Sequence, residues 1–212
     1  MTLLAVDTAL GACSVAIIEG EAVLAHRFAL MERGHAEALG PMVEEAMTQA
    51  GLPFTAIERL AVTTGPGTFT GQRVGLAFMR GLRLALKRPL TGVSTLAAMA
   101  EQAKVQSGMP AAAALHDAKR GEVYFQHSSA DEPSIMPFEA ALATLSRDSQ
   151  PLALAGTAAQ AAVGQLAHAV LSGIRQPDAL WVARLALGAP LQEGPPRPLY
   201  LRAPDAKLPS AK

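Results

Sequence analysis

Residues 60–86 contain the feature that most constrains the fold, a glycine-rich block between an apolar strand and a long helix. The strand is predicted at Leu60–Thr64, and the block reads Gly-Pro-Gly-Thr-Phe-Thr-Gly-Gln-Arg-Val-Gly over residues 65–75. Such a strand–loop–helix junction directs backbone N–H groups and the positive end of the helix towards one point, which suits an anion. The block lacks the Lys-Ser/Thr pair of a Walker loop and the spacing of a dinucleotide-binding loop. It is either a phosphate-binding loop of another type or a tight turn that packs the helix against a sheet.

Short strands and helices alternate along the chain, which predicts an α/β fold. Strands are expected at residues 3–6, 14–18, 22–28, 60–64, 90–93, 111–115, 122–126 and 152–155. Helices are expected at residues 36–50, 68–86, 95–103, 138–145, 158–171 and 179–187. A break at residues 106–110 divides the chain into a first lobe, 1–106, and a second, reduced lobe, 107–212, with an extended C-terminal tail. Residues after Ala203 are expected to be disordered.

Composition excludes several classes of protein. The 212 residues carry 18 basic and 18 acidic side chains, so zero net charge argues against a nucleic-acid binder that works by bulk charge. The single cysteine, Cys13, excludes an internal disulfide and fits a reducing compartment. No apolar run is long enough to span a membrane, and the N-terminus lacks a signal-peptide pattern. We therefore expect a cytoplasmic protein with no membrane partner.

One carboxylate, one hydroxyl and two glycines are the candidate phosphate-binding residues: Asp7, Thr8, Gly65 and Gly67. The first predicted strand ends on Asp7-Thr8, which places a carboxylate and a hydroxyl near Gly65 and Gly67 if the strands are neighbours. Asp7 then faces a phosphate-bound metal. Alternatively, Asp7 forms an Asx turn that hydrogen-bonds its own loop.

Two predicted helices carry features that fit either the protein interior or a partner. The helix at residues 36–50 has an apolar face, which ordinary core packing and an adaptable partner surface both explain. This face includes Leu39, Met42, Val43 and Met47. Glycines in the next helix each lower its stability by about 1 kcal/mol relative to alanine, so we expect something to approach its backbone closely. These glycines are Gly71, Gly75 and Gly81.

The same glycine-rich helix carries a basic stripe. Its four cations project within about 80° of one another at helical spacing. They are Arg73, Arg80, Arg83 and Lys87. A solvated helix face explains the stripe, and so does a surface for an RNA backbone or an acidic partner.

Four motifs occur in an order that resembles the bacterial TsaB family, also called YeaZ. They are Leu-Ala-Val-Asp-Thr at residues 4–8, the glycine block at 65–75, Asp-Ala-Lys-Arg-Gly-Glu-Val-Tyr at 117–124 and Pro-Leu-Tyr-Leu-Arg at 198–202. The resemblance implies an actin/Hsp70/sugar-kinase-like (ASKHA) fold of two lobes, each with a mixed sheet flanked by helices. It also implies a paralogue of the catalytic TsaD proteins, acting in threonylcarbamoylation of the adenosine next to the anticodon in tRNAs that read ANN codons.

The resemblance further implies the partners. We expect a TsaD-like catalytic subunit, a TsaE-like ATPase reached through the complex, a homodimer when the chain is alone, and tRNA only through the complex. ATP is then used by the assembled complex, and this chain alone binds no cofactor. The catalytic paralogues bind a metal through an H-x-x-x-H pair, whereas the equivalent stretch here, Ser94–Met99, has no histidine. We therefore expect no metal site, no catalytic residue and a scaffold or activator role.

The alternative is a nucleotide-binding, phosphate-handling enzyme that uses Asp7 and the Gly65–Gly67 loop. In the scaffold hypothesis, the partner binds the first-lobe helices through Leu39, Met42, Val43, Met47, Gly71, Arg73, Val74, Gly75 and Phe78. The sequence leaves open the balance of homodimer and heterodimer, nucleotide binding at the interface, and direct tRNA contact by the basic stripe.

Overall fold

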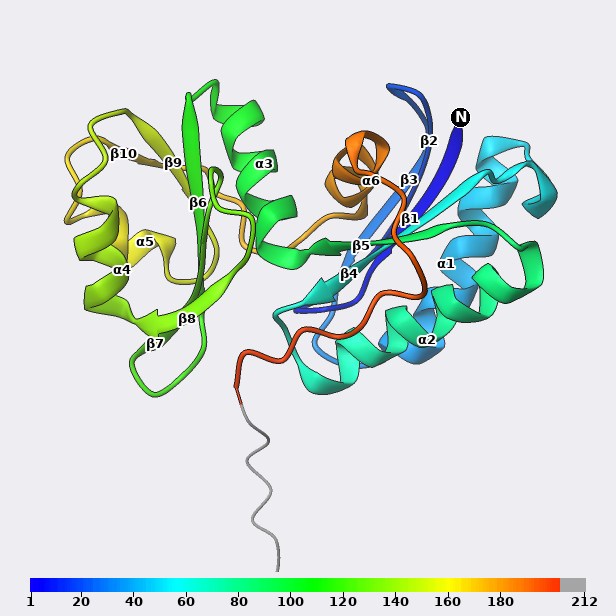
Figure 1. Cartoon of the computed structure of the whole chain (residues 1–212), viewed down its shortest axis with the longest axis horizontal. Helices are drawn as coiled ribbons and strands as arrows, with labels where there is room; N and C mark the ends of the chain where they lie inside the picture. Colours follow the sequence, from blue (N-terminus) through cyan, green and yellow to red (C-terminus); the bar gives the residue numbers. More distant parts are fainter. Residues whose placement is uncertain (203–212) are drawn as a thin grey trace, which may run out of the picture.

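The computed structural model describes residues 1–202, which form two α/β lobes side by side (Figure 1). The disorder expected after Ala203 lies outside the described residues. Each lobe contains one mixed five-stranded sheet, ordered β3-β2-β1-β4-β5 in the first lobe and β10-β9-β6-β7-β8 in the second. The predicted two-lobed α/β fold is confirmed.

The first sheet begins with the predicted meander. β1 (Thr2–Asp7), β2 (Ala12–Glu19) and β3 (Ala22–Leu30) pair antiparallel in succession. β4 (Arg59–Gly65) then pairs parallel with β1, and β5 (Leu90–Ser94) pairs parallel with β4. This order places the ends of β1 and β4 next to each other, so the strand-end Asp7 and the glycine block meet at one edge of the sheet.

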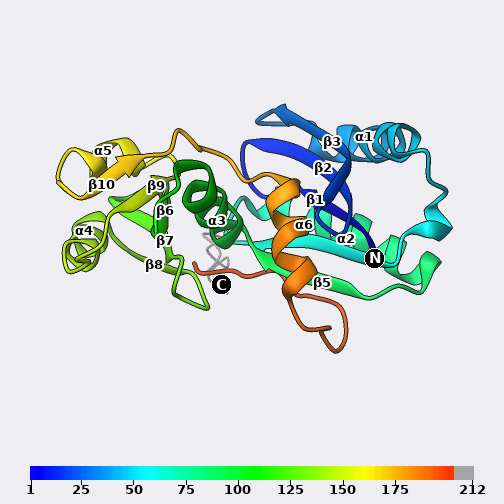
Figure 2. The ribbon, with the colours of Figure 1, turned by 90° about the horizontal axis from the view of Figure 1, so that it is seen from above.

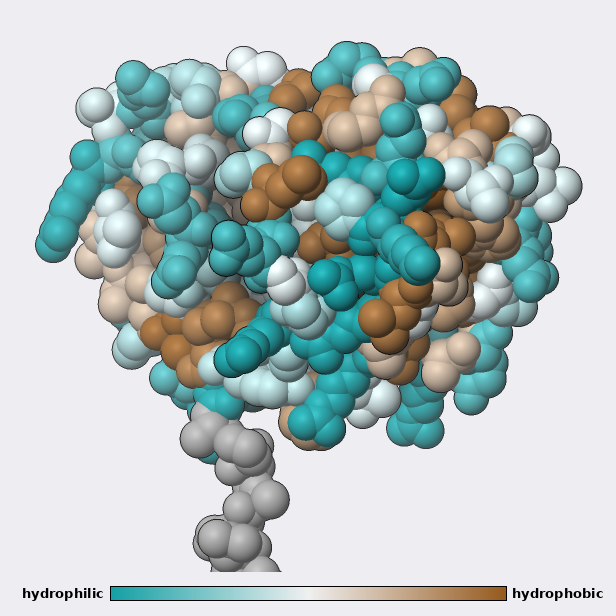
Figure 3. Space-filling model, turned by 45° about the vertical axis from the view of Figure 1, so that its right-hand side comes forward, coloured by the Kyte–Doolittle hydropathy of each residue, from teal (hydrophilic) through white to brown (hydrophobic). Residues whose placement is uncertain are grey.

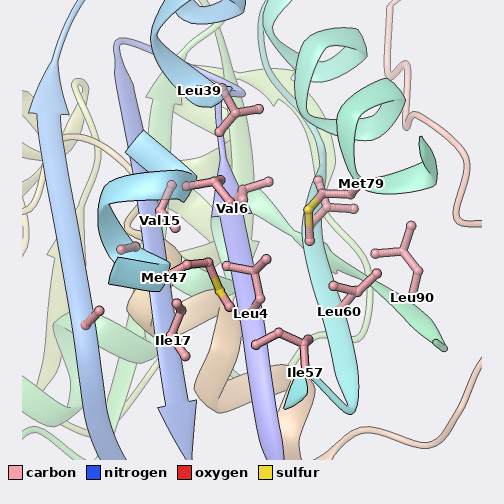
Figure 4. Close-up of a cluster of buried hydrophobic side chains, with 14 of the residues drawn as sticks. Leu4, Val6, Val15, Ile17, Leu39, Met47, Ile57, Leu60, Met79 and Leu90 are labelled. Atoms are coloured by element: carbon pink, nitrogen blue, oxygen red, sulfur yellow. The ribbon is translucent and has the colours of Figure 1, made fainter. Parts of the chain in front are cut away.

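Helices cover both faces of the first sheet. α1 (His35–Ala50) and α2 (Phe69–Leu86) pack on one face and enclose the main core, part of which is drawn in Figure 4. A short 3₁₀ turn, Phe54–Ala56, precedes β4. The other face is covered by α6 (Ala179–Gly188), whose Trp181 belongs to one buried cluster with Leu3, Ala5 and Ile18 of the sheet. Burial on both faces explains why the middle of β1, Leu3 to Val6, is continuously apolar rather than alternating.

The second lobe repeats the hairpin plan. Its strands are β6 (Ala111–Asp117), β7 (Glu122–His127), β8 (Ser134–Pro137), β9 (Leu152–Ala155) and β10 (Ala169–Leu171). Its helices are α3 (Thr95–Ser107), α4 (Phe138–Leu145) and α5 (Ala159–Val163). α3 packs on one face of the sheet, and α4 and α5 pack on the other. The predicted boundary at residue 106 lies inside α3.

The helix predicted at residues 158–171 is wrong. α5 ends at Val163, and Ala169–Leu171 form an edge strand parallel to β9. Alanine is the best helix former, but helix propensity is small in energy compared with tertiary contacts. Here the edge of β9 offers backbone hydrogen bonds, and the buried Leu166 anchors the turn between α5 and β10. Tertiary pairing therefore overrides local propensity here.

The last part of the described chain runs along the first lobe, as Figure 2 shows, and ends against the second lobe, where Arg202 pairs with Glu122. After α6, residues 189–202 run in extended form beside β5 and α2, and we call this segment the strap. Gln192 exchanges side-chain hydrogen bonds with the backbone of Gly92 on the β5 edge, and Leu199 N–H donates to Thr64 O at 2.8 Å. Arg59 donates to Ala189 O as well as to Thr91. The strap therefore covers an otherwise open sheet edge.

Candidate functional site

The glycine block forms the predicted strand–loop–helix junction. Thr68 caps α2, its hydroxyl accepting a hydrogen bond from Gly71 N–H at 3.1 Å. Thr68 N–H donates to Ala9 O at 2.8 Å, and a Cβ at Gly67 would overlap that same carbonyl. The loop is thus pressed against the turn that follows β1.

Asp7 lies fully buried beneath this loop. Its Oδ1 accepts hydrogen bonds from Thr63 Oγ1 at 2.6 Å and from Ala9 N–H at 3.2 Å, and its Oδ2 has no partner among the described residues. Burial raises the pKa of Asp7 to about 7, because the charged form is deprived of water. The bond to Ala9, two residues on, is the Asx turn that the sequence left as an alternative.

The Thr8 hydroxyl connects the end of β1 to α2, because it both donates and accepts a hydrogen bond. Its hydroxyl donates to Gly71 O at 2.7 Å and accepts from Gly75 N–H at 3.0 Å. A Cβ at Gly71 would overlap Thr8 O, and one at Gly75 would lie 2.7 Å from Thr8 Oγ1, whereas Gly81 has nothing within 4 Å. The close approach expected at Gly71 and Gly75 is therefore made by the chain's own first strand. Both glycines are buried and offer no surface to a partner.

The predicted partner-binding set divides into core and surface. Leu39 and Val43 are 1% exposed and Met47 is 4% exposed, so these three belong to the core of the first lobe and not to its surface. Met42, Val74 and Phe78 are half-buried at the edge of that core, and Arg73 is exposed. The part of the prediction that remains accessible is the outer side of α1 and α2.

A cavity of about 510 Å³ lies between the lobes, beside the α2 N-terminus. Gly67 lines it, but Asp7, Thr8 and Gly65 do not. Two lining residues were missed by the sequence reasoning: Gln72, whose Oε1 is buried, and His116, whose Nδ1 is buried, both without a partner among the described residues. Burial lowers the pKa of His116 to about 4, which keeps its ring neutral near pH 7.

The basic stripe is partly used inside the molecule. Arg73 Nε donates to Tyr200 Oη at 2.9 Å, and its guanidinium lies 3.6 Å from the centre of the Phe69 ring. Arg80 donates to Pro196 O. These two arginines hold the strap against α2, which the spacing of the stripe alone did not indicate.

Residues 1–202 contain neither a metal-binding cluster nor a membrane-spanning helix. No group of three or more His, Cys, Asp or Glu side chains in this range is placed to hold a metal ion. None of the helices in it is long and apolar enough to cross a membrane.

Comparison with known proteins identifies the family. The model for the family "TsaD: tRNA N6-adenosine threonylcarbamoyltransferase" matches residues 28–134. The tRNA threonylcarbamoyladenosine biosynthesis protein TsaB of Escherichia coli K12 is 43% identical over 135 residues, which cover 64% of this chain and 58% of that protein. The YeaZ structure from Pseudomonas aeruginosa has a TM-score of 0.76 at 32% identity, covering 88% of this chain and 91% of that one. This chain belongs to the TsaB/YeaZ family.

Other similarities extend this result. An uncharacterized protein of Mycobacterium tuberculosis is 34% identical over 209 residues, covering 97% of this chain and 94% of that protein. Component A of a 2-hydroxyglutaryl-CoA dehydratase from Acidaminococcus fermentans matches with a TM-score of 0.52 at 10% identity, which shows the ASKHA-like fold alone. The matched segments span little more than half of the first curated TsaB relatives, 58% for E. coli and 52% for Haemophilus influenzae.

Proposed function

We propose that this chain is a non-catalytic scaffold or activator of a TsaD-type transferase. The transferase attaches threonylcarbamoyl to the adenosine next to the anticodon in tRNAs that read ANN codons. The names of the curated relatives, which place them in tRNA threonylcarbamoyladenosine biosynthesis, support this pathway. In this proposal a TsaE-like ATPase joins through the catalytic subunit, ATP is used by the assembly, and the chain acts in the cytoplasm.

The observation that carries the non-catalytic role is the closure of the β1–α2 junction. Asp7 is 0% exposed and Thr8 is 1% exposed, and the Thr8 hydroxyl is committed to Gly71 and Gly75. A group that acts on a phosphate must come within hydrogen-bonding distance of it. Because the Asp7 carboxylate is buried below the loop, the junction is suited to holding α2 in place and not to binding a substrate.

The proposed partner surface is the accessible apolar side of α1 and α2. Met42, Val74 and Phe78 are large apolar side chains that the lobe only half buries. Such residues favour burial against a second apolar surface, which here is the TsaD-like subunit, or another copy when the chain is alone.

Two variants test this surface. Val74→Glu should abolish co-purification with the TsaD-like subunit, because it places a charge at the centre of the apolar contact. Ala143→Glu, at an exposed position of α4 in the second lobe, is the matched control and should bind normally. Thermal melts establish that both variants are folded, and normal binding by folded Val74→Glu would reject the interface.

Reconstitution tests the role as a whole. Modification of a tRNA transcript by the TsaD-like and TsaE-like enzymes, supplied with the threonylcarbamoyl-adenylate intermediate, should depend on added chain. Undiminished modification without the chain would refute the scaffold role.

One observation favours the alternative of a nucleotide-binding enzyme. The inter-lobe cavity is lined by the unpartnered atoms Gln72 Oε1 and His116 Nδ1, which a ligand could satisfy. Calorimetry with Mg-ATP on the isolated chain separates the two functions. The scaffold proposal expects no tight binding, and micromolar affinity would favour the enzyme.

A further inference from the structure

The two flanks of α2 differ in chemistry. Val74 and Phe78 lie on the flank next to α1, where they join the main core cluster. At about 100° per residue, Arg83 and Lys87 point about 140° or more away from Val74. They lie on the opposite flank, beside the strap. A partner bound to the apolar flank therefore leaves the basic flank uncovered.

The basic flank forms a hollowed surface together with the strap. Two adjacent depressions, of about 370 and 390 Å³, share Arg83 and Leu84 in their walls. The cations that line them are Arg80, Arg83, Lys87, Arg88 and Arg197. The one carboxylate among the lining residues is Glu193. Figure 3 shows a broad hydrophilic band across this side of the molecule, bordered by hydrophobic side chains.

Three of these cations do not help to hold the described residues together. Arg80 donates to the strap, and Arg88 makes a long contact to Thr55 O. The side chains of Arg83, Lys87 and Arg197 make no hydrogen bond or ion pair with any residue between 1 and 202. Because the whole chain has zero net charge, such a concentration of unpaired cations is a local feature and not a consequence of composition.

We propose that this surface, formed by the α2 cations and Arg197 of the strap, binds the phosphate backbone of the tRNA substrate. The naming of tRNA rests on the function proposed above. From Arg80 to Lys87 the row is about 10 Å long at 1.5 Å per residue. A nucleic-acid strand carries a phosphate about every 3.4 Å of duplex axis, so the row faces about three phosphates.

The chemistry of the arginines and the side chains that line the depressions favour RNA over an acidic protein as the ligand. Arginine presents a planar set of donors that binds phosphate oxygens in pairs, and four of the five cations are arginines. The depressions are also poor in the large aromatic side chains that anchor protein interfaces. Contacts of this kind fix the position of the RNA without reading its sequence, which suits one protein that serves many tRNAs.

The test compares two charge reversals of equal size. R83E/K87E changes the surface, and R33E/R147E places the same charge change on exposed arginines elsewhere, which likewise lack side-chain partners in residues 1–202. Affinity for an unmodified tRNA transcript is measured against salt, with the chain alone and with the TsaD-like subunit added. Co-purification with that subunit is scored for each variant.

R83E/K87E should weaken tRNA binding at least tenfold at moderate salt. It should also reduce the slope of log affinity against log salt by about 2, one for each phosphate that the variant no longer neutralises. It should still co-purify with the TsaD-like subunit, and R33E/R147E should match the wild type.

Equal tRNA affinities for the two double variants would overturn the proposal. So would loss of subunit binding with tRNA affinity retained, which would make the surface a protein-binding site. Because tRNA affinity is read directly, failure of the scaffold role in the modification assay remains a separate result.

Discussion

Replacing Gly75 by alanine should destabilise the protein, although alanine is the better helix former. The added methyl group would lie 2.7 Å from Thr8 Oγ1 and 3.4 Å from a Val62 methyl carbon. The Thr8 hydroxyl cannot simply rotate away, because it bonds both Gly71 O and Gly75 N–H in the interior. Overpacking of this kind costs about 1–3 kcal/mol. Strain in two buried hydrogen bonds adds about 1 kcal/mol, and the helix gains about 1 kcal/mol from alanine. The expected net loss is about 2 kcal/mol.

Gly81→Ala is the matched control on the same helix. A Cβ there meets nothing within 4 Å, so only the helix propensity changes and the variant should gain about 1 kcal/mol. The two variants should therefore differ by about 3 kcal/mol, or roughly 6–12 °C in Tm for a chain of this size. Urea unfolding followed by the fluorescence of the single tryptophan, Trp181 on α6, measures the difference. A Gly75→Ala protein as stable as Gly81→Ala would refute the proposed packing of α2 on β1.

Three further predictions concern buried groups and the strap. The folded state keeps a proton on Asp7 that the unfolded chain releases from about pH 4 upwards, so this residue lowers stability as pH rises to about 7. The stability of Asp7→Asn relative to wild type should therefore increase by on the order of 4 kcal/mol between pH 4 and pH 8, as measured by urea unfolding of both proteins at each pH. A stability difference between the two proteins that does not change with pH would contradict this. Cys13 is fully buried and burial raises its pKa to about 11, so it should react with a thiol reagent at pH 8 only as fast as the protein unfolds; immediate labelling of the native protein would contradict this. A methyl group at Gly92 would press on Pro196 Cβ at 2.7 Å, so Gly92→Ala should loosen the strap and speed amide exchange at Leu199 about tenfold or more, and unchanged exchange would count against that packing.

Local patterns were enough to predict most elements of the fold. The meander and the strand–loop–helix at the glycine block depend on neighbouring residues, so apolar runs and turn residues identify them. The segment 158–171 was mispredicted because the strand at 169–171 exists only by pairing with β9, a contact that no local pattern encodes. The packing of α6 and the strap on the first sheet likewise depends on contacts between residues that are far apart in the sequence.

The sequence identified individual residues of the candidate site but not the contacts between them. The sequence singled out Asp7, Thr8, Gly71 and Gly75 separately, yet gave no sign that Thr8 bonds both glycines. The apolar face of α1 could not be divided into core and surface, because Leu39 and Met42 are equally apolar and only packing separates them. Gln72 lies within the glycine block and His116 directly precedes the motif at residues 117–124, but no pattern marks either side chain, and only the cavity between the lobes brings them together.

The position of α6 has a consequence for synthesis on the ribosome. A nascent chain that has emerged as far as residue 107 carries every strand of the first sheet but leaves the face with Leu3, Ala5 and Ile18 uncovered. The helix that covers this face ends about 80 residues later, which at 5–20 residues per second is a delay of roughly 4–16 s. The second lobe can fold in that interval, so the lobe encoded first is expected to be completed last, and a chaperone has a defined apolar surface to protect until then.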